Sequence, residues 1–303
     1  MNTMYGVVLA VLGAVAFGTM PLLAKVAYQS TGAVTVVFLR YLLAVCFMFV
    51  FFMAKGVKLK ITGAQLVKVA FLGVVGYAGT GITLFSSFHF IDVGPAMVFH
   101  FIYPSIVATL ALVIYREKLS LLQVVGLILS LLGIYCLLGG GQFKLNFVGV
   151  GLALASGLFF AINALEIGRG QTKSMDNMVL TFYLSLFAAL GTLCFGLLTN
   201  DLHFQLDRNG WVAMGILGLV CTVFAIGAFS MAVRIIGSAK TAILNTFEPV
   251  TSIVLGALLL GEKMSGIMIL GSGLIIAAAV IFCLPQQEAG ECANEMLGQK
   301  TRA

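Results

Sequence analysis

The chain is a succession of long apolar runs that are separated by short polar breaks. Each run is about 20 residues long, the length that an α-helix needs to cross the ~30 Å hydrocarbon core of a membrane. Ten runs are present: 4–27, 33–54, 66–88, 93–114, 120–138, 147–168, 177–199, 211–233, 239–260 and 265–284. The breaks carry glycine and charged residues, which are typical of turns. The pattern therefore predicts an all-α integral membrane protein with ten transmembrane helices, numbered here as spans one to ten.

Composition agrees with this prediction. Hydrophobic residues make up 61% of the chain and charged residues 9%, whereas soluble domains carry roughly 25% charged residues. The first run, 4–27, lacks the basic segment and the cleavage site of a signal peptide, so we expect it to be retained as a span. The segment 285–303 has too little apolar content to pack, and we expect it to be a polar, disordered cytoplasmic tail.

Basic residues are distributed unevenly between alternate breaks. If the N-terminus is cytoplasmic, twelve Lys and Arg residues lie inside and four lie outside. The inner set is Lys55, Lys58, Lys60, Lys68, Arg116, Lys118, Arg169, Lys173, Arg234, Lys240, Lys300 and Arg302, and the outer set is Lys25, Lys144, Arg208 and Lys263. Cytoplasmic loops are enriched in Lys and Arg, so we expect both termini in the cytoplasm and the chain in the plasma membrane. This scattered charge also argues against nucleic acid as a partner.

The chain contains an internal duplication. Residues 91–138 align without a gap onto residues 236–283, which lie 145 positions further along. The shared residues include Pro104 and Pro249, Glu117-Lys118 and Glu262-Lys263, Ser120 and Ser265, and Gly126 and Gly271. Duplicated helical membrane proteins are a recurrent design of secondary transporters, in which the solute site lies between the repeats.

The duplication divides the chain into two domains of five spans, residues 4–138 and residues 147–284. Because five is an odd number, the second copy must cross the membrane in the opposite sense from the first. The sequence therefore predicts two inverted five-helix repeats that are related by an axis in the membrane plane.

The repeated motif, together with Ala16-Phe17-Gly18 in the first span, resembles the EamA-type branch of the drug/metabolite transporter superfamily. Each repeat has a proline followed thirteen residues later by Glu-Lys. The first copy departs from the usual form, because Arg116 precedes its glutamate where the second copy has Gly261. The resemblance covers residues 4–284. It implies export or exchange of amino acids and related metabolites, through a central cavity lined by spans one, three, four, six, eight and nine.

Three of the five prolines lie inside spans: Pro21, Pro104 and Pro249. A proline within a helix removes one backbone hydrogen bond, bends the helix and releases the carbonyl four residues earlier. For Pro104 and Pro249 those carbonyls belong to His100 and Asn245. Two interpretations stay open: the kinks are tolerated by packing, or they are hinges that shape a cavity wall and gate it.

Polar residues recur on one face of several spans near these prolines. In span nine they follow helical spacing, and His100 and Tyr103 in span four match Asn245 and Glu248. The candidate substrate-binding residues are Glu248, Asn245, His100, Tyr103, Asn163, Tyr77, Thr80, Arg40 and Phe160. Polar groups that face lipid are costly, so we expect these residues to converge on one cavity.

Glu248 is the leading candidate, because it lies about 14 Å into its span, where a carboxylate must be paired or neutralised. Arg40, about 10 Å into span two, could pair with Glu248, bind a substrate carboxylate, or extend to lipid head groups. Glu248 or His100 could carry a coupling proton. Glu166 is followed three residues later by Arg169, which predicts a local ion pair.

Several chemistries are not expected. The chain has no ATP-binding loop, no metal-ligand spacing and no pair of nucleophile and base, so we expect no enzyme activity, no cofactor and no metal. The predicted function is a secondary active transporter that works by alternating access, and the alternative is a channel or facilitator. The expected partners are a small solute and the lipid bilayer. The protein is either a monomer or a homodimer through spans five and ten, whose small residues allow close helix contact. These residues are Gly126, Ser130, Gly133, Gly273 and Ala277.

Overall fold

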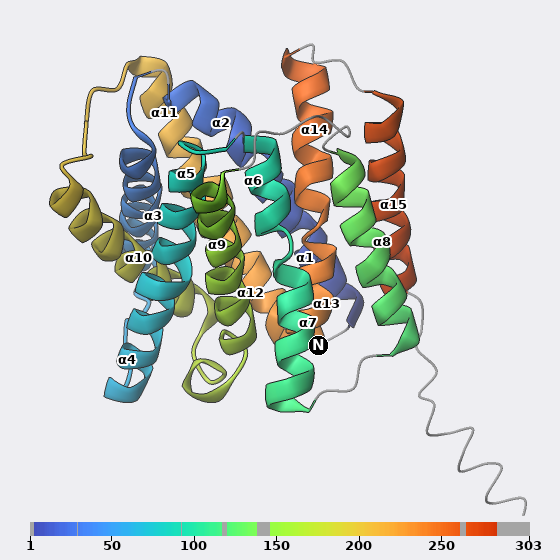
Figure 1. The fold of residues 1–303 in the computed structure, drawn as a ribbon. Coiled ribbons are helices and arrows are strands. Elements are labelled where there is room, and N and C mark those ends of the chain that lie inside the picture. Colours follow the sequence, from blue (N-terminus) through green and yellow to red (C-terminus); the bar gives the residue numbers. More distant parts are fainter. Residues whose placement is uncertain are drawn as a thin grey trace, which may run out of the picture.

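The computed structural model describes residues 3–28, 30–91, 93–116, 120–137, 146–260 and 265–283, and all regular secondary structure in these ranges is helical (Figure 1). The elements are α1 (Thr3–Gly18), α2 (Met20–Ala27), α3 (Ala33–Lys55), α4 (Gly63–Phe71), η1 (Leu72–Ala78), α5 (Gly79–Ser87), α6 (Val93–His100), α7 (Tyr103–Tyr115), α8 (Leu121–Leu137), α9 (Phe147–Glu166), η2 (Gly170–Thr172), α10 (Asn177–Thr199), α11 (Arg208–Ile216), η3 (Leu217–Phe224), α12 (Ala225–Ile236), α13 (Ser238–Leu244), α14 (Phe247–Leu260) and α15 (Gly266–Cys283).

Eight helical stretches of the described residues are long and apolar enough to cross a membrane. They are Thr3–Ala27, Ala33–Lys55, Gly63–Ser87, Ala96–Tyr115, Phe147–Glu166, Asn177–Thr199, Arg208–Ile236 and Ser238–Leu259. Two shorter apolar helices, Leu121–Leu137 and Gly266–Ile281, lie where the sequence predicts spans five and ten. The prediction of an all-helical membrane protein is confirmed, whereas the count of ten spans and their inverted arrangement stay predictions.

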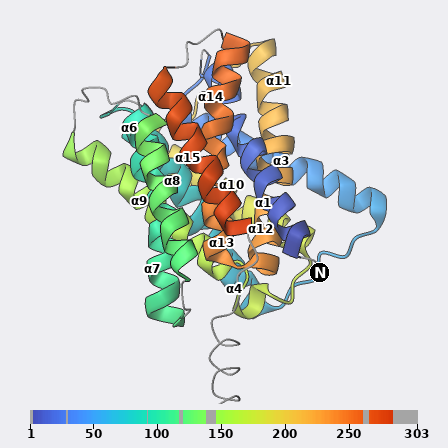
Figure 2. The ribbon, with the colours of Figure 1, turned by 90° about the vertical axis from the view of Figure 1, so that its right-hand side faces the viewer.

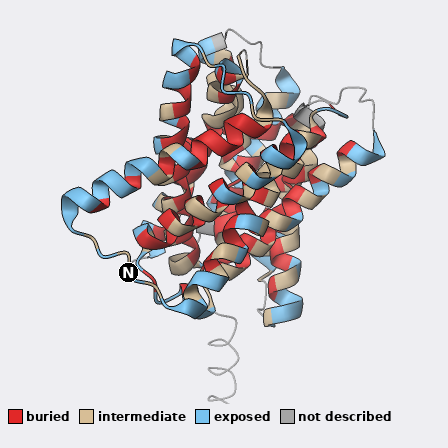
Figure 3. Ribbon diagram, turned by 90° about the vertical axis from the view of Figure 1, so that its left-hand side faces the viewer, coloured by how far each residue is buried: buried red, intermediate tan, exposed pale blue. Residues whose placement is uncertain are grey.

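The outer surface of the helix bundle is apolar. Large hydrophobic side chains such as Val50, Leu198 and Leu258 are 67%, 84% and 75% exposed. Figure 3 shows buried residues concentrated inside the bundle and exposed residues at its ends and on its outer helix faces. Contiguous apolar surface of this kind is costly in water, and it is the surface expected of helices that face hydrocarbon tails.

Irregular helix geometry recurs at the spacing of the sequence duplication. The π-helical segments η1 and η3 begin at Leu72 and Leu217, and 217 − 72 = 145. The α6–α7 break and the α13–α14 break lie just before Pro104 and Pro249 respectively. A further break at Thr19 separates α1 from α2 and precedes Pro21. Spans one, four and nine are therefore interrupted where the sequence places its internal prolines.

Helices α8 and α15 pack against each other within one chain, and Figure 2 shows them side by side. A Cβ added to Gly271 would lie 2.6 Å from the carbonyl oxygen of Gly133, so both glycines are needed for backbone contact. Gly273 is exposed and has open space around it. Part of the predicted small-residue face thus serves contacts inside the chain, and a homodimer through α8 and α15 stays a prediction.

This packing gives a test with a matched control on the same helix. Gly271→Val should lower the melting temperature in detergent by several degrees, because overpacking costs about 1–3 kcal/mol. Gly273→Val adds the same side chain where the structure has room, so it should melt close to the wild type. Equal melting temperatures of the two variants would contradict the close contact between α8 and α15.

Candidate functional site

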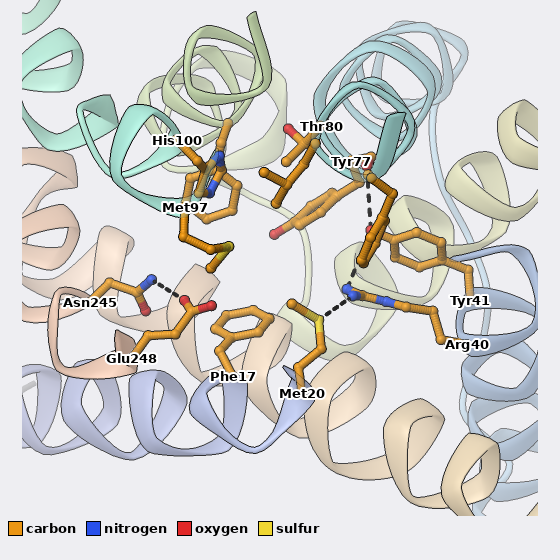
Figure 4. Close-up of a pocket in the computed structure, with 14 residues that line it drawn as sticks. Phe17, Met20, Arg40, Tyr41, Tyr77, Thr80, Met97, His100, Asn245 and Glu248 are labelled. Carbon is orange, nitrogen blue, oxygen red and sulfur yellow. Dashed lines mark hydrogen bonds between the residues drawn. The ribbon is translucent and has the colours of Figure 1, made fainter. Parts of the chain in front are cut away.

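A pocket lies inside the bundle, between α1, α2, α3, α5, α6, α9 and the junction of α13 with α14 (Figure 4). Its lining residues are Phe17, Met20, Arg40, Tyr41, Tyr77, Thr80, Gly81, Leu84, Phe85, Met97, His100, Phe160, Asn245 and Glu248. The structure thus brings together most of the predicted substrate-binding residues, namely Arg40, Tyr77, Thr80, His100, Phe160, Asn245 and Glu248. That they bind a substrate stays a prediction.

Two predicted site residues, Tyr103 and Asn163, are buried beyond the pocket. Tyr103 donates a hydrogen bond to the carbonyl of Ala242 at 3.2 Å, and its ring packs against Phe160 with centroids 4.7 Å apart. The Tyr103 ring also lies against the His100 ring, with centroids 5.6 Å apart, so the helix break between these two residues does not separate their side chains. Asn163 lies one turn after Phe160 and packs against Gly76 of η1.

The acidic side of the pocket is formed by Glu248 and Asn245. Glu248 is 7% exposed, lies in the first turn of α14 and accepts a hydrogen bond from the side-chain amide of Asn245 at 3.2 Å. The positive end of the helix dipole favours negative charge there. The Oδ1 atom of Asn245 is buried and has no hydrogen-bond partner among the described residues. Together they offer carboxylate and amide oxygens to a cation or an ammonium group.

The basic side of the pocket is Arg40. Its side chain donates to the sulfur of Met20 at 2.6 Å and to the hydroxyl of Tyr41 at 3.4 Å. Its guanidinium carbon also lies 4.7 Å from the centroid of the Tyr41 ring. Its Nε atom is buried without a partner in the described part of the chain. Thioether and phenol are weak acceptors for a guanidinium that can bind a carboxylate with two hydrogen bonds.

Arg40 and Glu248 lie on opposite sides of the pocket, with Phe17 and Met20 between them (Figure 4). Across the described ranges, no ion pair joins these two residues. Two of the three sequence-based alternatives for Arg40 are therefore wrong. It is not paired with Glu248, and it does not extend to lipid head groups, because it is only 7% exposed. The remaining alternative, binding of a substrate carboxylate, is compatible with the position of the Arg40 guanidinium in the pocket wall.

The wall between the two charged residues is mainly apolar, and sequence reasoning did not find most of it. Met20, Leu84, Phe85 and Met97 line the pocket without any polar signature that would mark them in an apolar span. Phe17, which belongs to the first-span motif, also lines the pocket. Methionine adapts to ligands of different shape. This wall therefore suits the apolar part of an amphipathic solute.

His100 contributes an imidazole whose protonation pattern follows from its neighbours. The hydroxyl of Ser156 donates to the carbonyl of Ala153 at 2.6 Å, and its oxygen lies 2.9 Å from Nδ1 of His100. Because the single hydroxyl proton is used, Nδ1 must be the donor in that contact. A neutral His100 then has an unprotonated Nε2, which can accept a proton.

The carbonyls released at the two kinks each contact another part of the protein. The Asn245 carbonyl accepts a hydrogen bond from the backbone of Glu248 at 3.0 Å. The His100 carbonyl is covered by α9, since a Cβ on Gly157 would lie 2.8 Å from its oxygen. Both carbonyls are thus covered by the protein, whereas His100 and Asn245 themselves line the cavity.

The hinge interpretation of the prolines remains a prediction, and it can be separated from a purely structural role. Pro104→Ala and Pro249→Ala should restore a regular backbone at the breaks and slow exchange by roughly tenfold, with a smaller effect on binding. Pro21→Ala tests the third break in the same way. Exchange rates in liposomes and binding measured by thermal stabilisation give the two readouts. Lower affinity with unchanged turnover would show that the prolines only shape the pocket.

The fold and the pocket define a multi-pass α-helical membrane protein that holds oppositely charged side chains around an internal cavity. The family model of the EamA-like transporter family matches residues 4–139 and 147–284. The chain therefore belongs to the EamA-like transporter family. This family is described as one of transporters, and the two relatives below are also named as transporters.

Individual relatives agree with this assignment. The chain is 25% identical over 201 residues to "Uncharacterized transporter sll1319" of Synechocystis sp. (strain ATCC 27184 / PCC 6803 / Kazusa), covering 64% of this chain and 60% of that protein. It is 25% identical over 214 residues to "Uncharacterized transporter YxxF" of Bacillus subtilis (strain 168), covering 68% and 66%. The matches thus span less than two thirds of these relatives. A protein crystal structure is similar in fold, with a TM-score of 0.78, 20% identity and coverage of 92% of this chain and 98% of that one.

Proposed function

We propose that the protein is a secondary active transporter that exports or exchanges an amino acid with an apolar side chain. One observation carries this proposal: Arg40 and Glu248 lie on opposite sides of one pocket, and neither has an ionic partner among the described residues. Burying two such charges unpaired is costly. A zwitterion offsets both costs, because its carboxylate can bind Arg40 while its ammonium group binds Glu248 and Asn245.

Alternating access is the mechanism that we propose for this pocket. In that view, residues 4–138 and 147–284 form two inverted repeats of five spans, with the site between them. The recurrence of the π-helical segments and of the helix breaks at the repeat spacing supports this arrangement. Movement at the breaks near Pro104 and Pro249 would expose the pocket to one side at a time.

Proton coupling follows from the same geometry. When an ammonium group leaves Glu248, a proton is the cation that can replace it on a buried carboxyl group. Solute and proton would then compete for Glu248, and an inward proton gradient would drive the solute outward. His100, with Nε2 able to accept a proton, is the alternative carrier.

Countertransport in liposomes tests the function. Vesicles loaded with leucine or phenylalanine should take up the labelled amino acid faster than empty vesicles, and the rate should saturate. Analogues that lack either the amino or the carboxyl group should bind at least about tenfold more weakly, since each loses a charge-assisted interaction. Equal binding of both analogues would refute the zwitterion. Unitary currents without countertransport would favour the channel alternative.

We also propose that the protein lies in the plasma membrane with both termini in the cytoplasm. Lys144, which contributes to the charge count, lies outside the described residues, so Gln205 in the α10–α11 loop is the better probe of the outer face. Lys58 and Gln205 are both exposed. In intact cells an impermeant thiol reagent should label Gln205→Cys and not Lys58→Cys. Labelling of both from outside would contradict this topology.

A further inference from the structure

A cluster of charged and aromatic side chains joins three helices at the end of the bundle away from the pocket. Lys68 of α4 donates a hydrogen bond to one carboxylate oxygen of Glu166 at the end of α9, and Tyr115 at the end of α7 donates to the other. The guanidinium carbon of Arg169 lies 3.4 Å from the centroid of the Tyr115 ring. The expectation of a local Glu166–Arg169 pair therefore missed the contacts with Lys68 and Tyr115, which come from other helices.

The loop after α9 is bound to α4 and to α12 at the same end. Gln65 of α4 donates to the Gln171 carbonyl and to the Ser174 hydroxyl, both at 3.3 Å. Arg234 of α12 donates to the carbonyls of Met175 and Thr172 at 2.8 and 2.7 Å. Helices α4, α7, α9 and α12 are thus joined at one end by polar contacts between segments distant in sequence.

The pocket opens toward the other end. Its lining residues that keep partial exposure include Met20, Thr80 and Met97, from α2, α5 and α6, in the upper part of Figure 1. The starts of α1 and α4 and the end of α7 lie in the lower part of the same view. Between pocket and cluster, Phe101 and Tyr103 are 1% and 0% exposed, so the passage is closed there.

The closed passage contains polar groups that have no partner. Both polar atoms of the Asn163 side chain are buried without a hydrogen bond in the part of the chain that the structure describes. The buried hydroxyls of Tyr77 and Ser230 lie beside each other and have only each other as partner in the described part of the chain, and Asn163 packs against the neighbouring Gly76. A buried polar atom without a partner costs free energy that a permanently closed helix interface would avoid. An interface that opens to water in a second state regains those hydrogen bonds.

Two helices carry these groups from the pocket to the cluster. On α9, Phe160 lines the pocket, Asn163 follows one turn later, and Glu166 ends the helix in the cluster. On α12, Ser230 is followed one turn later by Arg234, which binds the loop after α9. Residues three or four apart share a helix face, so Asn163 and Glu166 lie on one face of α9, and Ser230 and Arg234 lie on one face of α12.

We propose that Lys68, Tyr115 and Glu166 form a latch that holds the solute passage closed on the side away from the pocket, and that this passage runs past Tyr77, Asn163 and Ser230. The proposal rests on the proposed function, because a latch matters only if access alternates. By the charge-based orientation, the latch lies at the cytoplasmic end. Breaking it shifts the equilibrium toward the state in which that end is open, and the unpartnered groups become hydrated.

Cysteine accessibility in purified, reconstituted protein tests the latch. The six native cysteines are replaced by serine, and Ser230→Cys reports on the closed passage while Thr80→Cys reports on the pocket side. Glu166→Gln or Lys68→Met should speed thiol labelling at Ser230→Cys roughly three- to tenfold, and labelling at Thr80→Cys should fall. The opposite signs identify a shift between two states, because partial unfolding would raise both rates.

Two matched variants complete the design. Lys173 is an exposed lysine in the loop that carries Arg169, and Lys173→Met should change neither labelling rate. The charge swap of Lys68→Glu with Glu166→Lys should bring both rates back toward the wild-type values if the ion pair is the latch. The swap also keeps the test decisive where a single variant folds poorly.

The outcomes separate the latch from the proposed function. Saturable countertransport together with unchanged labelling in Glu166→Gln and Lys68→Met refutes the latch and leaves the transporter proposal intact. Parallel increases at both reporter positions, or the same effect in Lys173→Met, also refute it. Absence of countertransport by the wild type refutes the proposed function, whatever the labelling shows.

Discussion

Replacing Glu248 with glutamine is expected to weaken binding of an amino acid by roughly 10- to 100-fold and to abolish the dependence of transport on a proton gradient. The variant keeps the shape of the side chain and its contact with Asn245, which lies 3.2 Å away. It removes the only carboxylate that lines the pocket among the described residues. A charge-assisted hydrogen bond is worth about 1.5–3 kcal/mol, which corresponds to the expected loss of affinity. Uptake at several external pH values, with the internal pH fixed, measures the coupling.

A second pair of measurements shows whether the carboxylate acts on the amino group of the solute. The analogue without an amino group should bind the wild type and Glu248→Gln equally well, because it has no ammonium group to lose. His100→Asn, which installs the residue found at the repeat-related position, tests the alternative proton carrier. Unchanged pH dependence in Glu248→Gln with its loss in His100→Asn would move the coupling site to His100. Wild-type behaviour of both variants would show that the polar residues at the two kinks serve packing and take no part in proton coupling.

Much of the fold follows from the sequence because hydrocarbon solvent imposes one strong rule. Every backbone polar group inside a membrane must be satisfied within the protein, so a long apolar run predicts a helix with few alternatives. The predicted runs 33–54 and 177–199 correspond to Ala33–Lys55 and Asn177–Thr199. The short helices Leu121–Leu137 and Gly266–Ile281 show the limit of that rule, because apolar length alone does not establish that they cross the membrane.

The candidate site was predictable where it depends on local pattern. Asn245, Glu248 and His100 stand out because a polar residue in an apolar span needs a reason, and the duplication relates His100 to Asn245. Other residues at the site were misplaced or missed by sequence reasoning, for a different reason. Tyr103 packs against His100 and Phe160 but lies behind the pocket lining, and Met97 gives no signal in an apolar run. Lys68, the partner of Glu166, lies 98 residues away along the chain, so only the fold brings them together.

Replacing Arg40 with methionine is expected to reduce amino acid binding by roughly 30-fold or more, because truncating one side of a buried charge pair costs about 2–5 kcal/mol. Arg40→Lys should recover only part of the loss, since a lysine keeps the charge but cannot make two parallel hydrogen bonds to a carboxylate. Binding of the analogue without a carboxyl group should be similar in the wild type and both variants. Arg208→Met, at an exposed position at the start of α11, serves as the control and should bind normally.

The melting temperature gives the Arg40 experiment a second readout. It should stay the same or rise in Arg40→Met, whereas binding should fall. In this structure Arg40 is 7% exposed, and among the described residues its guanidinium has only a thioether and a phenol as hydrogen-bond acceptors. A buried charge without an ionic partner is destabilising, so Arg40→Met should melt at the same temperature as the wild type or higher, even though it loses binding. Addition of the amino acid should then raise the melting temperature of the wild type alone. A variant that melts lower and still binds would show that Arg40 supports the fold and does not recognise the carboxylate.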